Sequence, residues 1–320
     1  MLFHHCTRLF FTLIATLAFV SACEKSRSTP EITIGVNAAQ ETLVTTGWLN
    51  EHLADPDLVV LDCSVRIEFD ENGGFRSLSG RTDYEAGHIP SAGFADLTSD
   101  LSNLESPFQF ALPTPEQFAS VMGALGVGDN TRVVLYDNSN SAWAARVWWM
   151  LRWVGFDRVA LLDGGLAAWT ADGHALSSEP ANHPVQQLTL NLRPELIANQ
   201  DEVHAAIDND AVHLIDALPE SHFRGDMIFY DRTGHIPGAA NIPSSSLMDE
   251  SGRYRPNEEL AAILEGDRKA RNITYCGGGI AASSNAFVMT RLGFTDVAVY
   301  ISSLQEWANN TDNPMVTDTP

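Results

Sequence analysis

The sequence predicts an α/β protein made of two tandem domains, each a parallel sheet flanked by helices. Two observations carry this prediction: short motifs occur twice along the chain, and aliphatic runs alternate with helical stretches in each copy. The chain has 320 residues, of which 44% are hydrophobic. This is enough for two domains that each bury a core of their own, and it excludes a wholly disordered chain.

The repeat is clearest in two motifs. Gly-His-Ile-Pro at residues 87–90 returns at residues 234–237, and Leu-Ala-Ala-Trp at 166–169 returns as Leu-Gln-Glu-Trp at 304–307. The offset is 147 residues for the first motif and 138 for the second, so one loop is expected to be longer in the first half. A repeat of this length indicates two whole domains rather than a solenoid.

Strands and helices alternate within each half. Aliphatic runs at residues 58–62 and 212–216 have the pattern of strands that are covered on both faces. Helical stretches at 141–154 and 281–292 follow, and Gly293 is a suitable residue to end the second one. This alternation predicts a parallel sheet in each half, with functional sites at the carboxyl ends of the strands.

Composition and the repeat together divide the chain into five segments. Prolines at 180, 184 and 194 predict a linker between the two halves. The expected segments are a signal peptide (1–22), a polar tether (23–40), a first domain (41–176), the linker (177–199) and a second domain (200–320).

The first 22 residues predict an export signal rather than part of the fold. The apolar run at residues 9–20 would span about 18 Å as a helix, well short of the roughly 30 Å of bilayer hydrocarbon. It ends in Val-Ser-Ala-Cys at residues 20–23, which resembles the lipidation box of bacterial lipoproteins; an ordinary secretory cleavage site is the alternative. We therefore expect a lipid on Cys23 that anchors an extracytoplasmic protein to the periplasmic side of a bacterial membrane. By the same resemblance, Glu24 favours the outer membrane.

The charge and the cysteines exclude several classes of function. The chain has 41 Asp and Glu against 19 Lys and Arg, a formal net charge of −22, and so acidic a protein is a poor partner for nucleic acid. The four cysteines, at 6, 23, 63 and 276, form no Cys-x-x-Cys pair and no His/Cys cluster, so they predict neither a zinc site nor a disulfide framework. Any cysteine chemistry is therefore expected to depend on a single thiol.

Cys276 is the candidate nucleophile. It follows an apolar, strand-like run and precedes three glycines and a predicted helix. Glycines let backbone N–H groups converge on one point, and the helix adds its positive N-terminal end, so both features stabilise a thiolate or the terminal sulfur of a persulfide. A buried, inert cysteine before a glycine turn is the alternative. The predicted active-site loop consists of Gly277, Gly278, Gly279, Ile280 and Ala281.

Taken together, these motifs resemble the rhodanese superfamily over residues 41–320, and they are most similar to tandem thiosulfate/3-mercaptopyruvate sulfurtransferases. The resemblance rests on both Gly-His-Ile-Pro motifs, Arg-Val-Trp-Trp at 146–149, Leu-Asp-Gly-Gly at 162–165 and Tyr-Cys-Gly-Gly-Gly-Ile-Ala at 275–281. It implies a site between the domains, with the sulfur carried by Cys276. It also implies a non-catalytic first domain, because Asp137 stands where the second half has Cys276.

The resemblance further implies substrate-binding residues. Arg146 is expected to contact an anionic substrate, with a solvated helix arginine as the alternative. Asp62 corresponds to an aspartate that mercaptopyruvate-type members place near the nucleophile, or it is a structural residue at a strand end. Arg224 lies in His-Phe-Arg-Gly, which resembles the family's Arg-Phe-x-Gly with His222 in the usual arginine place, so its contact with substrate stays open. Cys63 is interpreted as a small core residue rather than a resolving thiol.

Two departures from the family pattern leave the sulfur donor open. The loop after Cys276 carries neither the hydroxyls typical of mercaptopyruvate-type members nor the cations often found in thiosulfate-type members. A neutral loop helps a dianion less than a charged one. In addition, Ile-Ser-Ser at residues 301–303 replaces the usual Asp-Gly-Ser, which is expected to reshape the wall beside the site.

The activity implied by the resemblance is sulfur transfer. The Cys276 thiolate would take the outer sulfur of a small anionic donor, thiosulfate or 3-mercaptopyruvate, and pass it to cyanide or a thiol, with no metal or organic cofactor. One alternative is the phosphatase branch of the same fold, which is disfavoured because Ala282 stands where a Cys-x5-Arg loop needs its arginine. The other is a non-catalytic sulfur-binding or signalling module.

Overall fold

The computed structural model describes residues 42–69, 75–228 and 230–318. The expected signal peptide, the tether and Cys23 lie outside the described residues. Within the described ranges, no helix combines the length and the apolar character needed to cross a membrane.

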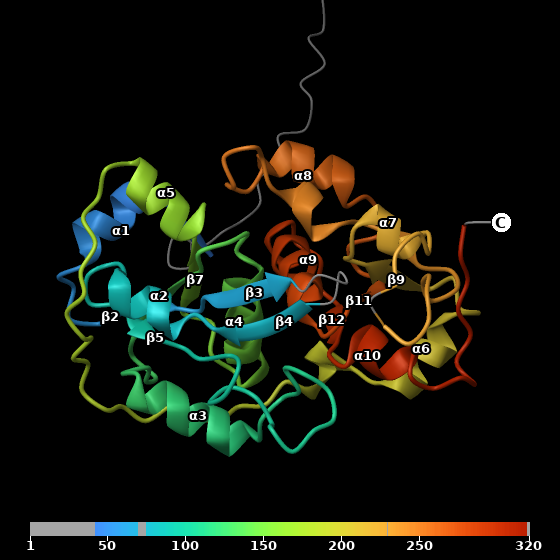
Figure 1. The fold of residues 1–320 in the computed structure, drawn as a ribbon, viewed down its shortest axis with the longest axis horizontal. Coiled ribbons are helices and arrows are strands. Elements are labelled where there is room, and N and C mark those ends of the chain that lie inside the picture. Colours follow the sequence, from blue (N-terminus) through green and yellow to red (C-terminus); the bar gives the residue numbers. More distant parts are fainter. Residues whose placement is uncertain (1–41, 70–74, 229, 319–320) are drawn as a thin grey trace, which may run out of the picture. The chain divides into compact units, whose positions relative to one another are not determined.

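The first half folds around a five-stranded parallel sheet (Figure 1). Its strand order is β1 (Leu43–Val44), β7 (Val159–Leu162), β6 (Arg132–Tyr136), β2 (Leu58–Asp62) and β5 (Gly93–Phe94). Its helices are α1 (Thr46–His52), α2 (Arg81–Ala86), α3 (Pro115–Ala124), α4 (Ala142–Trp153) and α5 (Gly165–Ala171). Strand β2, which lies between β6 and β5, is buried along its whole length, as its unbroken aliphatic run predicts.

The second half repeats this arrangement. Its strand order is β8 (Ile197–Ala198), β12 (Val297–Tyr300), β11 (Arg271–Tyr275), β9 (Val212–Asp216) and β10 (Ala240–Asn241), again all parallel. Its helices are α6 (Gln200–Ala206), α7 (Glu220–Phe223), α8 (Asn257–Ile263), α9 (Ile280–Arg291) and α10 (Ser303–Trp307), with 3₁₀ turns η1 (Pro194–Leu196) and η2 (Ser244–Leu247). Each strand therefore has a counterpart in the same place, which confirms the predicted fold class of two tandem parallel sheets.

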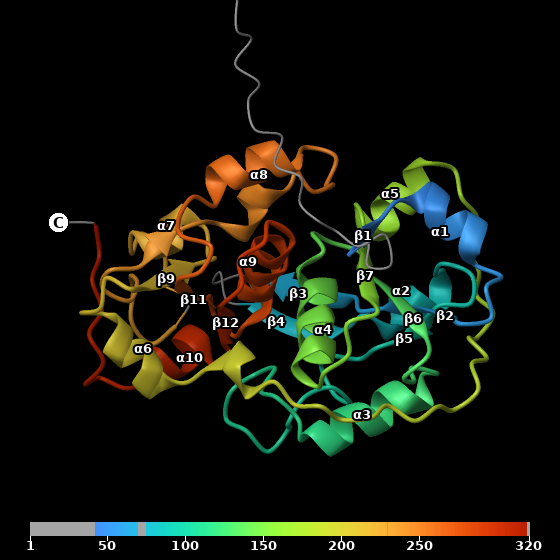
Figure 2. The same cartoon turned by 180° about the vertical axis from the view of Figure 1, so that it is seen from behind.

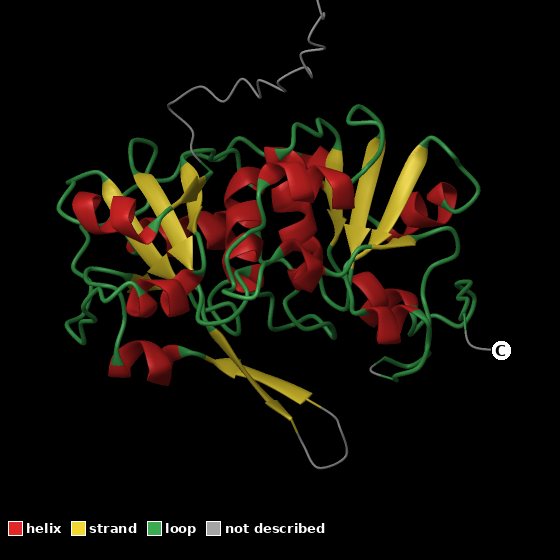
Figure 3. Cartoon of the chain, turned by 90° about the horizontal axis from the view of Figure 1, so that it is seen from above, coloured by secondary structure: helices red, strands yellow, loops and turns green. Residues whose placement is uncertain are grey.

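The extra residues of the first half do not form a single loop, contrary to the sequence expectation. One insertion is an antiparallel hairpin, β3 (Val65–Phe69) with β4 (Phe75–Ser79), which projects from the rest of the fold in Figure 3. Other extra residues lie before and within α3: the connection 95–114 is longer than its counterpart 242–256 before α8, and α3 has 10 residues whereas α8 has 7. The two motif offsets compare only residues 88–169 with 235–307, so they leave out the hairpin and give only the sum of the later insertions.

Helices α4 and α9 join the two halves by packing side by side, as the opposite views of Figures 1 and 2 both show. The rings of Trp148 and Phe287 meet edge to face with their centroids 5.0 Å apart. One buried cluster includes side chains from both sheets and both helices. The two halves are therefore joined by a shared buried core.

The duplicated motifs hold the segment that leaves each half. The His88 N–H donates to the carbonyl of Ser177 at 2.9 Å, and the His235 N–H donates to that of Val316 at 2.9 Å. In the same way, the indole N–H groups of Trp169 and Trp307 donate to carbonyls in the segments that follow them, each at 2.9 Å. The repeated residues therefore have a structural role, since they donate hydrogen bonds to backbone carbonyls of a segment that forms no helix there.

The segment expected to be a linker takes part in both halves. It starts in the bridge between Ser177 and His88 and ends in β8, which pairs with β12 at the edge of the second sheet. Pro194 starts the short η1 turn just before that strand.

Candidate active site

Cys276 follows β11 directly and is buried, with 2% of its surface exposed. Its N–H donates to Ser303 Oγ at 3.1 Å, and that hydroxyl in turn donates to the Tyr300 carbonyl at 2.5 Å. The Cys276 carbonyl accepts the N–H of Leu304 at 3.1 Å. The start of α10 therefore fixes the backbone of the cysteine, and Ser303 in the unusual 301–303 segment provides one of these contacts.

The three glycines after Cys276 are required by the groups that approach them. A Cβ atom on Gly277 would lie 1.5 Å from the Tyr230 hydroxyl oxygen. On Gly278 it would lie 2.2 Å from Gln305 Nε2, and on Gly279 it would lie 2.7 Å from Arg146 Nη1. Gly279 also has a φ of +79°, a conformation that side chains other than glycine rarely adopt. The loop is therefore enclosed by one side chain at each glycine.

Cys276 opens into a pocket of about 460 Å³ between the two halves. The first half contributes Ile67, Phe75, Ser77, Gln109, Phe110, Ser139, Asn140, Ala142 and Trp143; the second contributes Leu218, Tyr230, Cys276, Gly277, Gly278, Ile280, Ala281 and Gln305. The described lining thus holds no Arg, Lys, His, Asp or Glu. Gln305 closes one wall, because its Oε1 accepts the N–H of Gln109 at 2.7 Å.

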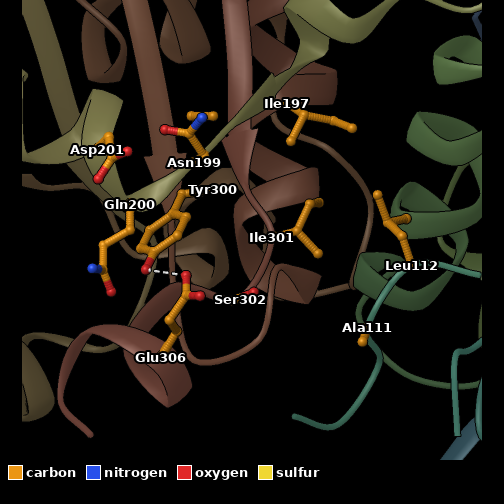
Figure 4. A pocket seen from close by; sticks show the side chains of 11 residues that line it. Ala111, Leu112, Ile197, Asn199, Gln200, Asp201, Tyr300, Ile301, Ser302 and Glu306 are labelled. Carbon is orange, nitrogen blue, oxygen red and sulfur yellow. Dashed lines mark hydrogen bonds between the residues drawn. The ribbon is translucent and has the colours of Figure 1, made fainter. Parts of the chain in front are cut away.

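A second pocket, of about 420 Å³, lies next to it and is shown in Figure 4. Ile301 and Ser302 line this pocket and not the one at Cys276. Asp201 and Glu306 are its acidic residues, and Glu306 accepts a hydrogen bond from the Tyr300 hydroxyl at 2.6 Å. Its described lining includes no cysteine, so the first pocket is the one that exposes the Cys276 thiol.

The first half shows how the corresponding loop holds an anion. Asp137 is buried, and its carboxylate accepts the backbone N–H groups of Ser139, Ser141, Trp143 and Ala144 at 2.9–3.1 Å. Burial raises the pKa of Asp137, and these four donors lower it. The helices that follow Asp137 and Cys276 both have 12 residues, and both begin after a residue of positive φ. The repeat therefore places Cys276 where the first half has this carboxylate, between the end of a strand and the N-terminus of the matching helix.

Arg146 does not line the pocket, where the sequence expectation placed it. Its side chain comes from α4, is 1% exposed, and donates from Nη2 to the Phe110 carbonyl at 2.7 Å. Neither Nε nor Nη1 has a hydrogen-bond partner among the described residues, and Nη1 faces Gly279 from behind the loop. Burial lowers the pKa of Arg146 to about 10, and the charge of the nearby Cys276 opposes this. The guanidinium is a buried cation beneath the active-site loop.

Asp62 also lies outside the pocket lining. Its buried carboxylate accepts the N–H of Ser64 at 2.8 Å and a hydrogen bond from Tyr136, whose hydroxyl oxygen accepts the N–H of Ile89 at 3.2 Å. The second half has the same chain of contacts from Asp216 through Tyr275 to Ile236. Asp62 therefore occupies the position of a repeated structural residue.

The remaining candidates are not at the site either. The Arg224 side chain is half exposed and forms an ion pair with Asp226 at 3.2 Å and a longer one with Glu220 at 3.5 Å. It is absent from the pocket lining. Cys63 is fully buried, and burial raises the pKa of its thiol well above the usual range, so the structure places it as a core residue.

Several residues at the pocket were not singled out from the sequence. Tyr230 lies against Gly277, and burial raises its pKa. It comes from an irregular segment without a period, so no pattern signals its position. The rings of Phe110 and Trp143 also line the pocket, tilted by 57° with their centroids 5.2 Å apart. Trp143 is the second residue of α4, so its position could have been found from the repeat.

The described residues contain no group of three or more His, Cys, Asp or Glu side chains that could hold a metal ion. The arrangement instead offers a single thiol in an uncharged pocket, with a buried cation behind its loop. Such a site can perform nucleophilic catalysis at sulfur.

Comparison with known proteins agrees with this arrangement. The chain matches the Rhodanese-like domain family at residues 45–172 and again at 199–310. It is 35% identical over 287 residues to the probable 3-mercaptopyruvate sulfurtransferase of Pseudomonas aeruginosa, covering 86% of this chain and 98% of that one. It is 33% identical over 279 residues to the thiosulfate sulfurtransferase of Cricetulus griseus, covering 83% and 91%.

A solved structure of similar sequence has the same fold as this chain. The crystal structure of SseA from Escherichia coli, described as a 3-mercaptopyruvate sulfotransferase, aligns with a TM-score of 0.72 at 32% identity. The alignment covers 81% of this chain and 97% of that one. With two matched domains, similar relatives over most of its length and the same fold, this chain belongs to the rhodanese family of tandem-domain sulfurtransferases.

Proposed function

We propose that the protein transfers sulfane sulfur through a persulfide on Cys276. The observation that carries the proposal is the position of this thiol: it directly follows a strand, lines the interdomain pocket, and stands where the first half has a carboxylate held by backbone amides. Amides arranged in this way stabilise the negative charge of both the thiolate and the persulfide. Arg146 adds a positive charge from behind the loop.

The reaction has two displacements. The Cys276 thiolate attacks the outer sulfur of the donor, an S–S bond to Cys276 forms, and the electron pair of the broken bond leaves with sulfite or with the enolate of pyruvate, which then takes a proton. The acceptor thiolate or cyanide next attacks the terminal sulfur, and the electron pair of the Cys276 S–S bond returns to Sγ. The two steps regenerate the thiolate and need no external oxidant.

The pocket supports 3-mercaptopyruvate more than thiosulfate as the donor. Thiosulfate is a dianion, and moving it into a pocket whose described lining has no cation costs more than moving a single carboxylate. Several of the similar proteins carry the name 3-mercaptopyruvate sulfurtransferase. Measuring kcat/KM for both donors side by side tests this preference, and a higher value for thiosulfate would reverse it.

Loading the enzyme with donor alone tests the mechanism. Without acceptor, the protein should gain one sulfur atom, about 32 Da, and peptide mapping should locate it on Cys276. Cys276→Ser should abolish the adduct and turnover, whereas the matched Cys63→Ser variant should retain both. An adduct on Cys63, or full activity of Cys276→Ser, would instead favour a non-catalytic sulfur-binding module.

We also propose that a lipid on Cys23 anchors the protein on the periplasmic side of a bacterial membrane. The support is the Val-Ser-Ala-Cys segment at residues 20–23 after a short apolar run. Cys23→Ser should release the protein from the membrane fraction or leave the signal uncleaved. Normal processing with unchanged fractionation would contradict the anchor.

A further inference from the structure

The walls of the Cys276 pocket are mainly apolar. Phe75 and Ile67 come from the projecting hairpin, the rings of Phe110 and Trp143 contact each other at an angle of 57°, and Tyr230 lies against Gly277. The polar lining groups are hydroxyls and amides, which bind a ligand without adding charge. Pockets of this composition take ligands with an apolar body and a few polar atoms.

The volume of the pocket also favours an organic ligand. Its volume of about 460 Å³ lies in the range of sites that enclose organic ligands. Cyanide or sulfite would fill a small part of it and would leave the aromatic walls in contact with water.

Charge provides a separate argument. Arg146 interacts electrostatically with Cys276, faces Gly279 and is absent from the pocket lining, so its charge supports the bound sulfur and not an entering ligand. The chain carries a formal net charge of −22, which repels anions as they approach. An anionic acceptor meets the same repulsion and the same uncharged lining as the donor, and in addition it must approach a persulfide that carries negative charge itself.

We propose that the sulfur acceptor is an uncharged organic thiol with an aromatic or aliphatic body, which seats against Phe110 and Trp143 while its sulfur reaches Cys276. This inference rests on the proposed function, because it concerns the second displacement of that reaction. The thiol loses its proton to water, and the resulting thiolate attacks the terminal sulfur of the persulfide. A new S–S bond forms, the bond to Cys276 breaks with its electron pair on Sγ, and the product leaves as an organic persulfide.

The test begins with enzyme that has been loaded with donor and freed of it. Single-turnover loss of the persulfide mass is then measured with phenylmethanethiol, 2-mercaptoethanol, 2-mercaptoethanesulfonate and cyanide. Each rate is divided by the rate of the same acceptor with a small persulfide in solution, which removes differences in intrinsic reactivity. We expect phenylmethanethiol to exceed 2-mercaptoethanesulfonate by roughly tenfold or more, the size of a modest binding preference.

Two variants separate the contributions of shape and charge. Phe110 has a φ of +57°, so Phe110→Asn removes the ring with a residue that tolerates this conformation, and it should reduce the preference for phenylmethanethiol. Ser139 is exposed and uses its backbone N–H to bind Asp137, so Ser139→Lys adds a cation at the pocket without removing that contact. Ser139→Lys should raise the relative rate of the sulfonate, and the neutral control Ser139→Gln should not.

The outcomes distinguish this inference from the proposed function. If no donor loads Cys276, the proposed function fails. If Cys276 loads but the sulfonate or cyanide reacts as well as phenylmethanethiol after normalisation, the acceptor class is wrong and the persulfide mechanism stands. An acceptor ranking that is the same in wild type and Ser139→Lys would likewise overturn the argument from charge.

Discussion

Replacing Asp62 with asparagine separates a catalytic role of this carboxyl from a structural one. Burial raises the pKa of Asp62 to about 6 from its ordinary value of 3.8, and the bonds from Ser64 and Tyr136 oppose this only in part. The folded state therefore favours the protonated form. This contribution to stability is present in full below the unfolded pKa of 3.8 and is lost as the pH rises through 6.

The magnitude follows from the two pKa values. A difference from 3.8 to about 6, at 1.36 kcal/mol per pKa unit, corresponds to roughly 3 kcal/mol of unfolding free energy. Asparagine is neutral at every pH, keeps an oxygen to accept the Ser64 N–H, and does not lose this contribution. The unfolding free energy of Asp62→Asn relative to wild type should therefore increase by up to about 3 kcal/mol between pH 4 and pH 7.

The repeat supplies a matched control in Asp216. Burial raises its pKa to about 7, and the bonds from Leu218 and Tyr275 oppose this only in part. Asp216→Asn should therefore show the same trend, with up to roughly 4 kcal/mol gained between pH 4 and pH 8. Urea unfolding at a series of pH values measures both differences.

Turnover of the same variants completes the test. Because the structure places neither carboxyl in the pocket lining, kcat/KM of Asp62→Asn should stay within about twofold of wild type, on the scale of one small free-energy change. A loss of activity beyond about a hundredfold, with stability curves parallel to wild type, would refute the structural interpretation and return Asp62 to the reaction.

Three further changes address the loop and its counterpart. Arg146→Met should slow both the loading and the unloading of Cys276 by roughly 30-fold, about 2 kcal/mol, because the guanidinium lies behind the active-site loop. Single-turnover rates of the two steps measure this effect. A loss confined to the donor step would instead make Arg146 a substrate contact. Gly277→Ala should reduce turnover by at least about tenfold, since its Cβ would lie 1.5 Å from the Tyr230 hydroxyl oxygen. Adding Tyr230→Ala in the same chain should restore part of the turnover. If it does not, the backbone conformation of Gly277, and not the contact with Tyr230, is what requires a glycine. Asp137→Ala should lower the free energy of unfolding by about 3 kcal/mol because four backbone donors lose their acceptor, and an unchanged urea midpoint would contradict this.

The duplicated motifs were sufficient to predict the fold, because strand and helix periods repeat in the same order and short parallel units have few arrangements. The loop at Cys276 was also predictable, since only closely approached backbone explains three successive glycines. The position of Arg146 was not, because it depends on how α4 packs against α9, which no local pattern encodes. The pairing of β3 with β4 does have a sequence signal, because apolar and polar residues alternate on both sides of Asn72-Gly73, a pattern typical of a hairpin.

The carboxylate of Asp137 has a consequence for the stoichiometry of the whole chain. A side chain tethered next to its own binding amides competes at an effective concentration far above that of any free ligand. The anion cradle of the first half is therefore saturated by the protein itself, so sulfite, sulfate and thiosulfate have no vacancy there. Binding of such anions should follow a single-site isotherm although the fold is present twice, because the carboxylate of Asp137 already occupies the loop of the first half.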